Sequence, residues 1–181
     1  IGGIMITIDG GTGIILNNGV EVASPKMVDY WYLNAALNSS HSGAAVPDSK
    51  WTRNNANAGA SQIGTGMSVD SNGIWTFPST GKYMITLHVN NRAISNDNMY
   101  LIISTTTDNS TYVFTRYVQS GSSGSDSNGH SGSGEYFVNV TDTSLVKVKL
   151  QAESIASGSY FEAKGSNTYI QTTVTFTRLS S

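Results

Sequence analysis

The sequence predicts an all-β protein, a sandwich of two packed antiparallel sheets, and three observations support this. Short runs of β-branched and aromatic residues alternate with polar residues, and turn-forming residues separate the runs at regular spacing. No segment of the 181 residues keeps a sustained 3.6-residue apolar period, and residues 35–37 give the only hint of a helical turn. Charged residues make up only 12% of the chain, and Ser, Thr, Asn and Gly fill the polar positions instead.

Residues 1–24 differ from the rest of the chain. Ile4, Ile6 and Ile8 alternate with other side chains, as in a short strand, and an Asp-Gly-Gly turn follows. Residues 14–16 form another short apolar run. Since these pieces are too short to build a core, we expect residues 1–24 to be an N-terminal arm or attachment segment and residues 25–181 to be the main domain.

In the main domain, alternating apolar runs between turn signals predict the strands. They are residues 30–33, 51–53, 63–69, 74–77, 81–89, 99–106, 111–119, 135–140, 145–152 and 168–178. The 63–69 strand is expected to be weak because Gly64 and Gly66 interrupt it. Residues 120–134 contain seven Ser and five Gly, a composition typical of a flexible loop. The loops at 34–50, 90–98 and 120–134 are expected to form the variable exposed surface.

Residues 73–89, G-I-W-T-F-P-S-T-G-K-Y-M-I-T-L-H-V, are the most informative block. A short strand runs into a Pro-Ser-Thr-Gly turn, in which Pro78 presets the backbone and Gly81 permits a tight turn. Tyr83 then begins a strand whose alternate side chains are apolar and face the core. The block determines the fold and carries no chemistry. Its signature residues are Gly73, Trp75, Phe77, Pro78, Gly81 and Tyr83.

This block resembles the central signature of the TNF/C1q-like jelly roll, in which a Pro-x-x-Gly-x-Tyr segment follows a strand that ends in an aromatic residue. The chain departs from the family pattern at Ile85 and Leu87, where the family often has aromatic residues. The resemblance extends over roughly residues 28–180. It implies an antiparallel jelly-roll sandwich in which the first strand lies beside the last.

Four segments together, residues 30–33, 51–53, 63–67 and 73–78, resemble the C1q-like domains of tailed phages. Those domains are virion components such as fibre tips, head fibres and capsid decorations. The resemblance implies a homotrimer with a structural or adhesive role at the virion surface. It also implies that the N-terminal arm contacts other virion proteins.

The aromatic residues exceed the number that one sandwich face must hold. Adjacent pairs such as Tyr136-Phe137 point to both faces of a strand, so one member of each pair faces outward or into an interface. We expect a trimer interface, and stacking on the sugar rings of a receptor is the alternative. The candidates are Tyr30, Tyr32, Tyr117, Phe137, Tyr160 and Phe161.

No motif places catalytic residues together, so we expect no enzymatic activity. The histidines lack metal-ligand spacing, no Gly-x-Ser-x-Gly elbow is present, and the aspartates fall in turns. No cofactor is expected, although oxygen-rich loops at 97–98 or 126–128 leave calcium as an alternative. The candidate residues of exposed binding loops are His41, Asn96, Asp97, Asp126 and His130.

The composition also excludes several classes of site and binding partner. The absence of cysteine excludes disulfides and thiolate zinc sites, and a net charge of -2 supplies no basic field for nucleic acid. No apolar run approaches the roughly 20 residues that cross a bilayer. The sequence therefore favours a trimeric structural protein of a tailed-phage virion that adheres to a host or environmental surface through a glycan or protein receptor. The alternative is a lectin-like carbohydrate-binding module of a bacterial surface or secreted protein.

Overall fold

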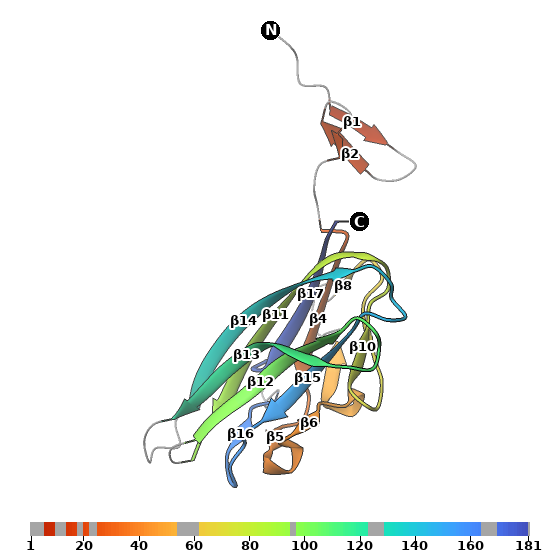
Figure 1. The fold of residues 1–181 in the computed structure, drawn as a ribbon. Coiled ribbons are helices and arrows are strands. Elements are labelled where there is room, and N and C mark those ends of the chain that lie inside the picture. Colours follow the sequence, from red (N-terminus) through yellow and green to blue (C-terminus); the bar gives the residue numbers. More distant parts are fainter. Residues whose placement is uncertain are drawn as a thin grey trace.

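The computed structural model describes residues 6–9, 14–17, 20–21, 25–53, 62–94, 97–122, 129–163 and 170–180. The main domain is a sandwich of two antiparallel sheets, as predicted (Figure 1). The helices among these residues are two single 3-10 turns, η1 (Ser39–His41) and η2 (Asp48–Lys50). In the described part of the chain, no helix has the length and apolar character needed to span a membrane. The helical turn suggested at residues 35–37 is wrong, because β5 (Leu37–Asn38) begins there.

The first sheet is built around β11 (Gly81–Arg92), which pairs with β14 (Gly129–Val140) on one side and β17 (Thr173–Ser180) on the other. Beyond β17 the order continues to β4 and β7, so the first strand of the domain lies beside the last. The remaining members are β4 (Met27–Leu33), β5, β7 (Trp51–Arg53), β8 (Gln62–Ile63) and β16 (Tyr160–Phe161).

The second sheet has the order β13-β12-β15-β10-β9, and β6 pairs with β15. Its two long strands, β12 (Asp97–Thr106) and β13 (Val113–Ser122), form a hairpin. The remaining members are β6 (Ala44–Ala45), β9 (Ser68–Val69), β10 (Ile74–Thr76) and β15 (Lys147–Glu153).

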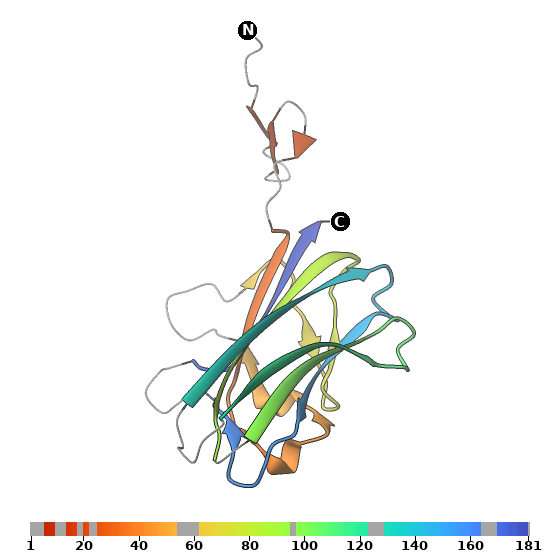
Figure 2. The same cartoon turned by 60° about the vertical axis from the view of Figure 1, so that its left-hand side comes forward.

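A small antiparallel sheet precedes the sandwich. It consists of β1 (Ile6–Asp9), β2 (Ile14–Asn17) and β3 (Val20–Glu21). In both views its β1–β2 hairpin lies beyond the end of the sandwich at which the C-terminus is found (Figures 1 and 2). The division into an arm of residues 1–24 and a domain from residue 25 stays a prediction.

The signature block occupies the centre of the core. The Trp75 ring is fully buried, and the rings of Trp31, Trp51 and Phe176 lie 5.1, 5.9 and 5.0 Å from it. The rings come from both sheets, so one side chain connects the two layers through aromatic contacts. The buried Tyr83 donates its hydroxyl to the Ser79 carbonyl at 2.9 Å, which holds the turn before β11.

Two glycines of the block are needed for backbone reasons. Gly73 has a φ of 72°, and a Cβ there would lie 2.6 Å from the Val46 carbonyl oxygen. Gly81 has a φ of 139°, and a Cβ there would meet the Ser180 carbonyl oxygen. Both positions therefore exclude side chains, and the signature positions serve the fold.

The open edge of the sandwich is closed where β13 contacts β14 (Figure 1). Gly132 and Gly134 face inward here, because a Cβ on Gly134 would lie 2.8 Å from the Val118 side chain and one on Gly132 would meet the Gln119 carbonyl. The flexible loop expected at 120–134 is therefore wrong over most of its length. Strand β13 runs to Ser122, β14 starts at Gly129, and residues 123–128 lie outside the described residues.

A buried ion pair holds the β4 side of the first sheet. The Asp29 carboxylate, which is fully buried, receives Arg53 Nε at 2.7 Å and the Met67 amide at 2.6 Å. Arg53 also lies over the Trp31 ring at 4.3 Å and donates to the Met67 carbonyl. Gly66 leaves the space that the carboxylate fills, which explains the glycine in the weak 63–69 segment.

Candidate binding surfaces

The three histidines lie apart. His41 ends η1 and its ring accepts the Asn38 amide at 3.2 Å. Burial and the Lys50 ammonium lower the pKa of His41 below its ordinary value. His130 was expected in a loop, which is wrong, because it pairs with Asn91 inside β14. Among the residues that the structure describes, no three His, Asp or Glu side chains gather as metal ligands would.

The acidic and amide candidates do not form a site together. Asp97 was expected to be exposed, but it begins β12, is 6% exposed and accepts the Ala156 amide at 3.1 Å. Its carboxylate therefore serves the fold. Asn96 and Asp126 lie outside the described residues. Asp108 accepts the Thr106 hydroxyl and the Thr111 and Ser110 amides, and these bonds hold its pKa well below the ordinary range.

Two of the six aromatic candidates are corrected by burial. Tyr32 is 7% exposed and Phe161 is fully buried, so neither offers the surface that an interface needs. In the adjacent Tyr-Phe pair of β16, Phe161 is the member that packs in the core. Tyr30 and Tyr160 are half-buried. Tyr117 and Phe137 are the most exposed of the six, at 52% and 61%.

Tyr117 and Phe137 lie on opposite faces of the sandwich, although their strands meet at one edge. Phe137 pairs with Met84, which points away from the core because its neighbours Tyr83 and Ile85 point into it. Tyr117 pairs with Ile102, which points away from the core between Leu101 and Ile103. The two exposed rings therefore belong to two different surfaces.

The first surface, called here the β11 face, is the outer side of β14, β11, β17 and β4. The register places its side chains in rows across the strands. The row that contains Phe137 has no charged side chain. The rows are Phe137-Met84-Thr177-Val28, Glu135-Thr86-Thr175-Tyr30 and Ser133-His88-Thr173-Tyr32.

Phe137 separates two hollows on the β11 face. One is a pocket of about 460 Å³ that Arg116, His88 and Glu135 line together with Phe137. The other has a volume of about 250 Å³ and is lined on one side by Leu179, which is 40% exposed. An exposed ring between two hollows is a shape that a complementary protein surface can cover.

The second surface, called here the β12 face, is the outer side of β13, β12 and β15. Tyr117 lies between two other rings, 6.0 Å from Tyr100 and 5.8 Å from Phe114, in edge-to-face contacts at 88° and 90°. These contacts are of the kind that aromatic pairs prefer. Beneath them Ile102 is 1% exposed although it lies outside the main core. The rows are Gln119-Tyr100-Glu153, Tyr117-Ile102-Gln151 and Phe114-Ser104-Lys149.

Comparisons with known proteins match this architecture. No protein-family model matches the sequence, and no curated protein matches it significantly. Among solved structures, murine APRIL at pH 8.0 is 12% identical, with 84% of this chain and 98% of that chain covered and a TM-score of 0.58. Eiger TNF from S. frugiperda is 10% identical, with 87% and 95% covered and a TM-score of 0.60. The chain has a TNF/C1q-like jelly-roll fold. PRD1 vertex protein P5 also matches, with 16% identity, 87% and 99% covered, and a TM-score of 0.43.

Within this TNF/C1q-like fold, the sequence reasoning missed the aromatic cluster of the β12 face. It selected Tyr117 but neither Tyr100 nor Phe114, because the alternation of one strand cannot show which residues lie opposite in the next. It also missed Arg116, whose side chain reaches over Gly134 to the β11 face. The signal available was the Phe-Thr-Arg-Tyr sequence at 114–117, in which aromatic and charged residues follow one another without turn residues.

Proposed function

We propose that this chain is a structural virion protein of a tailed phage, a head fibre, capsid decoration or tail-fibre tip, and that it acts as a homotrimer. Its fold and its resemblance to C1q-like phage domains support the proposal. The observation that carries the trimer is the β11 face. Phe137 is 61% exposed beside Met84, in a row of this face that has no charged side chain. A specific interface of this kind buries roughly 1,200 Å² or more in total.

The β11 face fits a copy of the same chain better than a small ligand. Its hollows flank one exposed ring, and hydroxyl-bearing β17 side chains separate the apolar ones, as in a flat contact between folded surfaces. In a threefold arrangement the contact is heterologous, so the Phe137 edge of one subunit packs against a different part of the next subunit's β11 face. The arm would then attach the trimer to other virion proteins.

The trimer is tested by mass in solution. Light scattering after size exclusion should give three times the 19.2 kDa of one chain at micromolar concentration. Phe137→Glu places a carboxylate in the contact and should release folded monomers, because an unpaired charge is costly to bury. Val113→Glu is the matched control, since Val113 is 59% exposed on β13. A stable wild-type monomer contradicts the proposal.

The virion role has its own test. Antibodies raised against the purified chain should label intact phage particles in electron micrographs, and mass spectrometry of purified particles should detect the chain. Finding it only in the culture supernatant or on the bacterial surface would favour the lectin-like alternative. The proposal assigns no catalysis to the chain, and glycan turnover that one carboxylate substitution abolishes would contradict that part.

A further inference from the structure

We infer that the β12 face binds an uncharged glycan chain, and that the aromatic cluster of Tyr100, Phe114 and Tyr117 is its stacking surface. The inference adds an adhesive site to the virion protein of the proposed function, and in that sense it rests on that function. It concerns a different face from the one proposed for the trimer, so each can fail without the other.

The aromatic cluster is assembled within one subunit. Tyr117 touches both other rings, and all three stand on adjacent strands β12 and β13, whose register is set by the hairpin. Ile102 lies beneath the rings at 1% exposure, so packing holds them in place. Tyr117 and Phe114 still expose 52% and 44% of their surface. Exposed rings that are already ordered can stack on a ligand at little cost in side-chain entropy.

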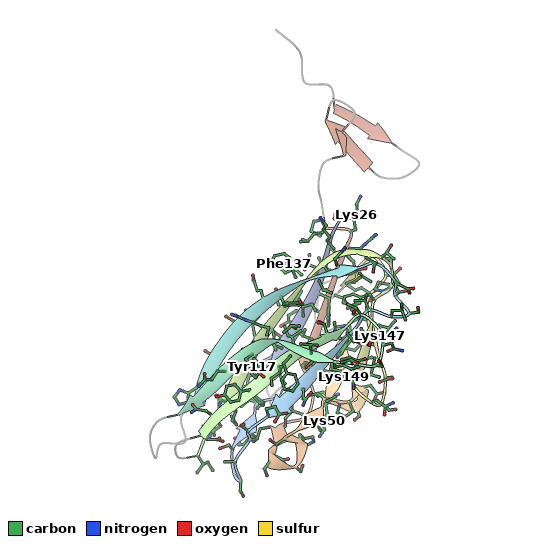
Figure 3. The ribbon with its side chains drawn as sticks, in the orientation of Figure 1. Lys26, Lys50, Tyr117, Phe137, Lys147 and Lys149 are labelled. Carbon is green, nitrogen blue, oxygen red and sulfur yellow. The ribbon has the colours of Figure 1, made fainter. Side chains whose placement is uncertain are left out.

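Hydrogen-bonding side chains flank the rings along β15. Gln151 donates to Glu153 at 2.8 Å, and on the β13 side Gln119 donates to Asn98 at 3.2 Å. Lys149 stands over the Tyr112 ring, 4.0 Å from its centroid. Figure 3 labels Tyr117 near β13 and Lys149 near β15. A chain of sugars along the strands would meet aromatic rings on one side and amide, carboxylate and ammonium groups on the other.

Charge selects the class of ligand. The three rows of the β12 face carry one carboxylate, Glu153, and one ammonium group, Lys149, and the next row adds Lys147, which donates to the Thr76 hydroxyl, so the surface is close to neutral and has no cluster of basic side chains. Nucleic acids and acidic polysaccharides need a basic surface. A sugar ring carries partially positive C–H groups that suit the negative face of an aromatic ring, and hydroxyls that suit amides and carboxylates. An uncharged glycan therefore fits both the aromatic rings and the hydrogen-bonding side chains of the β12 face.

The test is affinity electrophoresis and calorimetry of the full chain with neutral probes: laminarin, galactomannan, dextran and maltohexaose. At least one probe should bind. Tyr117→Ala should weaken that binding by roughly 10- to 100-fold, by analogy with the loss of an aromatic ring that stacks on a nucleic-acid base. Tyr117→Phe should keep most of it, and Gln151→Ala should weaken it less than Tyr117→Ala. Ile94→Ala, which removes a 47% exposed apolar side chain in the loop between β11 and β12, is the matched control and should leave binding unchanged.

The possible outcomes are distinct. Retention of wild-type affinity in folded Tyr117→Ala, no binding to any neutral probe, or binding only to heparin each overturns the inference. Dissociation of the trimer by Tyr117→Ala would also overturn it, because the face would then be a subunit contact. If the wild type is monomeric but binds a neutral probe through Tyr117, the trimer proposal fails and this inference stands. Thermal unfolding checks that the variants fold.

Discussion

The β11 face and the β12 face are both built from antiparallel strands, but their exposed aromatic side chains have different neighbours. On the β11 face, Phe137 is 61% exposed between two hollows and has no aromatic partner among the described residues. On the β12 face, Tyr117 contacts two rings and helps to cover Ile102. The first arrangement leaves a ring for another surface to cover, and the second completes a small cluster inside one subunit.

The difference shows that the exposed fraction of a side chain does not by itself indicate which kind of partner a surface binds. Tyr117 and Phe137 are similarly exposed and stand on neighbouring strands, yet their surroundings suit different partners. A large folded partner gains from broad, weakly polar area. A small ligand gains from ordered rings with hydrogen-bonding groups beside them. The comparison between the two faces can be tested by substitutions in the sandwich that carries both faces and at the β13–β14 edge that separates them.

The largest effect is expected from Asp29→Ala, which removes the buried partner of Arg53. The remaining guanidinium, whose side chain is only 25% exposed, would lose its counter-charge, and the Met67 amide would lose its acceptor. Breaking such a buried pair costs about 3–5 kcal/mol. Urea unfolding should show this loss. Glu135→Ala, an exposed carboxylate on the β11 face, is the control, and an equal loss in both variants would contradict the structural role of Asp29.

A smaller loss is expected from Gly134→Val at the edge between the two faces. The inward position has no space for a side chain, because Val118 and Arg116 fill it. Overpacking of this kind costs about 1–3 kcal/mol. Ser133→Val, one residue away, places the same side chain on the outer side and should cost little or nothing. Chemical unfolding of the pair measures the difference, and equal stability would show that β14 does not pack here as described.

The same edge explains what could be predicted from the sequence and what could not. The block at 73–89 was assigned correctly because its alternation, its turn and its buried aromatic residues all point to one structure. The stretch at 129–134 was assigned wrongly because composition suggested a loop. Its Gly and Ser residues in fact alternate with period two, and small residues face inward where two sheets come together.

The surfaces were less predictable than the fold. Alternation in a single strand shows that one of Tyr160 and Phe161 is buried, but it does not show which one. It also cannot show that Tyr100, Phe114 and Tyr117 meet, since that depends on the register and the bulge of the β12–β13 hairpin. Tertiary contacts between strands decide both outcomes, and they are set by turns and packing distant in the sequence.

A loss of about 1–2 kcal/mol is expected from Ser120→Ala, which acts at the same edge through a hydrogen bond. The buried Asn91 side chain accepts the Ser120 hydroxyl at 2.7 Å and donates to the Ser120 carbonyl at 3.1 Å, which ties β11 to β13. Removing the hydroxyl leaves a buried acceptor without its donor. Urea unfolding measures the loss. Ser131→Ala, an exposed serine on β14, is the control and should be neutral.

The smallest effect concerns pH and acts at the turn of the hairpin that carries the β12 face. Asp108, in the turn of the β12–β13 hairpin, has a pKa held well below the ordinary value of 3.8 because it accepts the Thr106 hydroxyl and two backbone amides. A carboxylate with a lowered folded pKa stabilises the protein above its unfolded pKa, and this contribution is lost as the pH falls below about 4. Acid should therefore weaken this turn, and it should weaken the turn between β14 and β15 in the same way, because the Ser144 hydroxyl and amide lower the pKa of Asp142.

Asp108→Asn tests this directly. The variant should be less stable than the wild type near neutral pH, and the gap should narrow as the pH falls from about 4 to about 2. Urea unfolding over that range measures the gap, and amide exchange at Ser110 and Thr111 locates it. Asp48→Asn is the control, because the Asp48 carboxylate accepts no hydrogen bond among the described residues. A constant gap at every pH would mean that the Asp108 charge does not stabilise the hairpin that carries the β12 face.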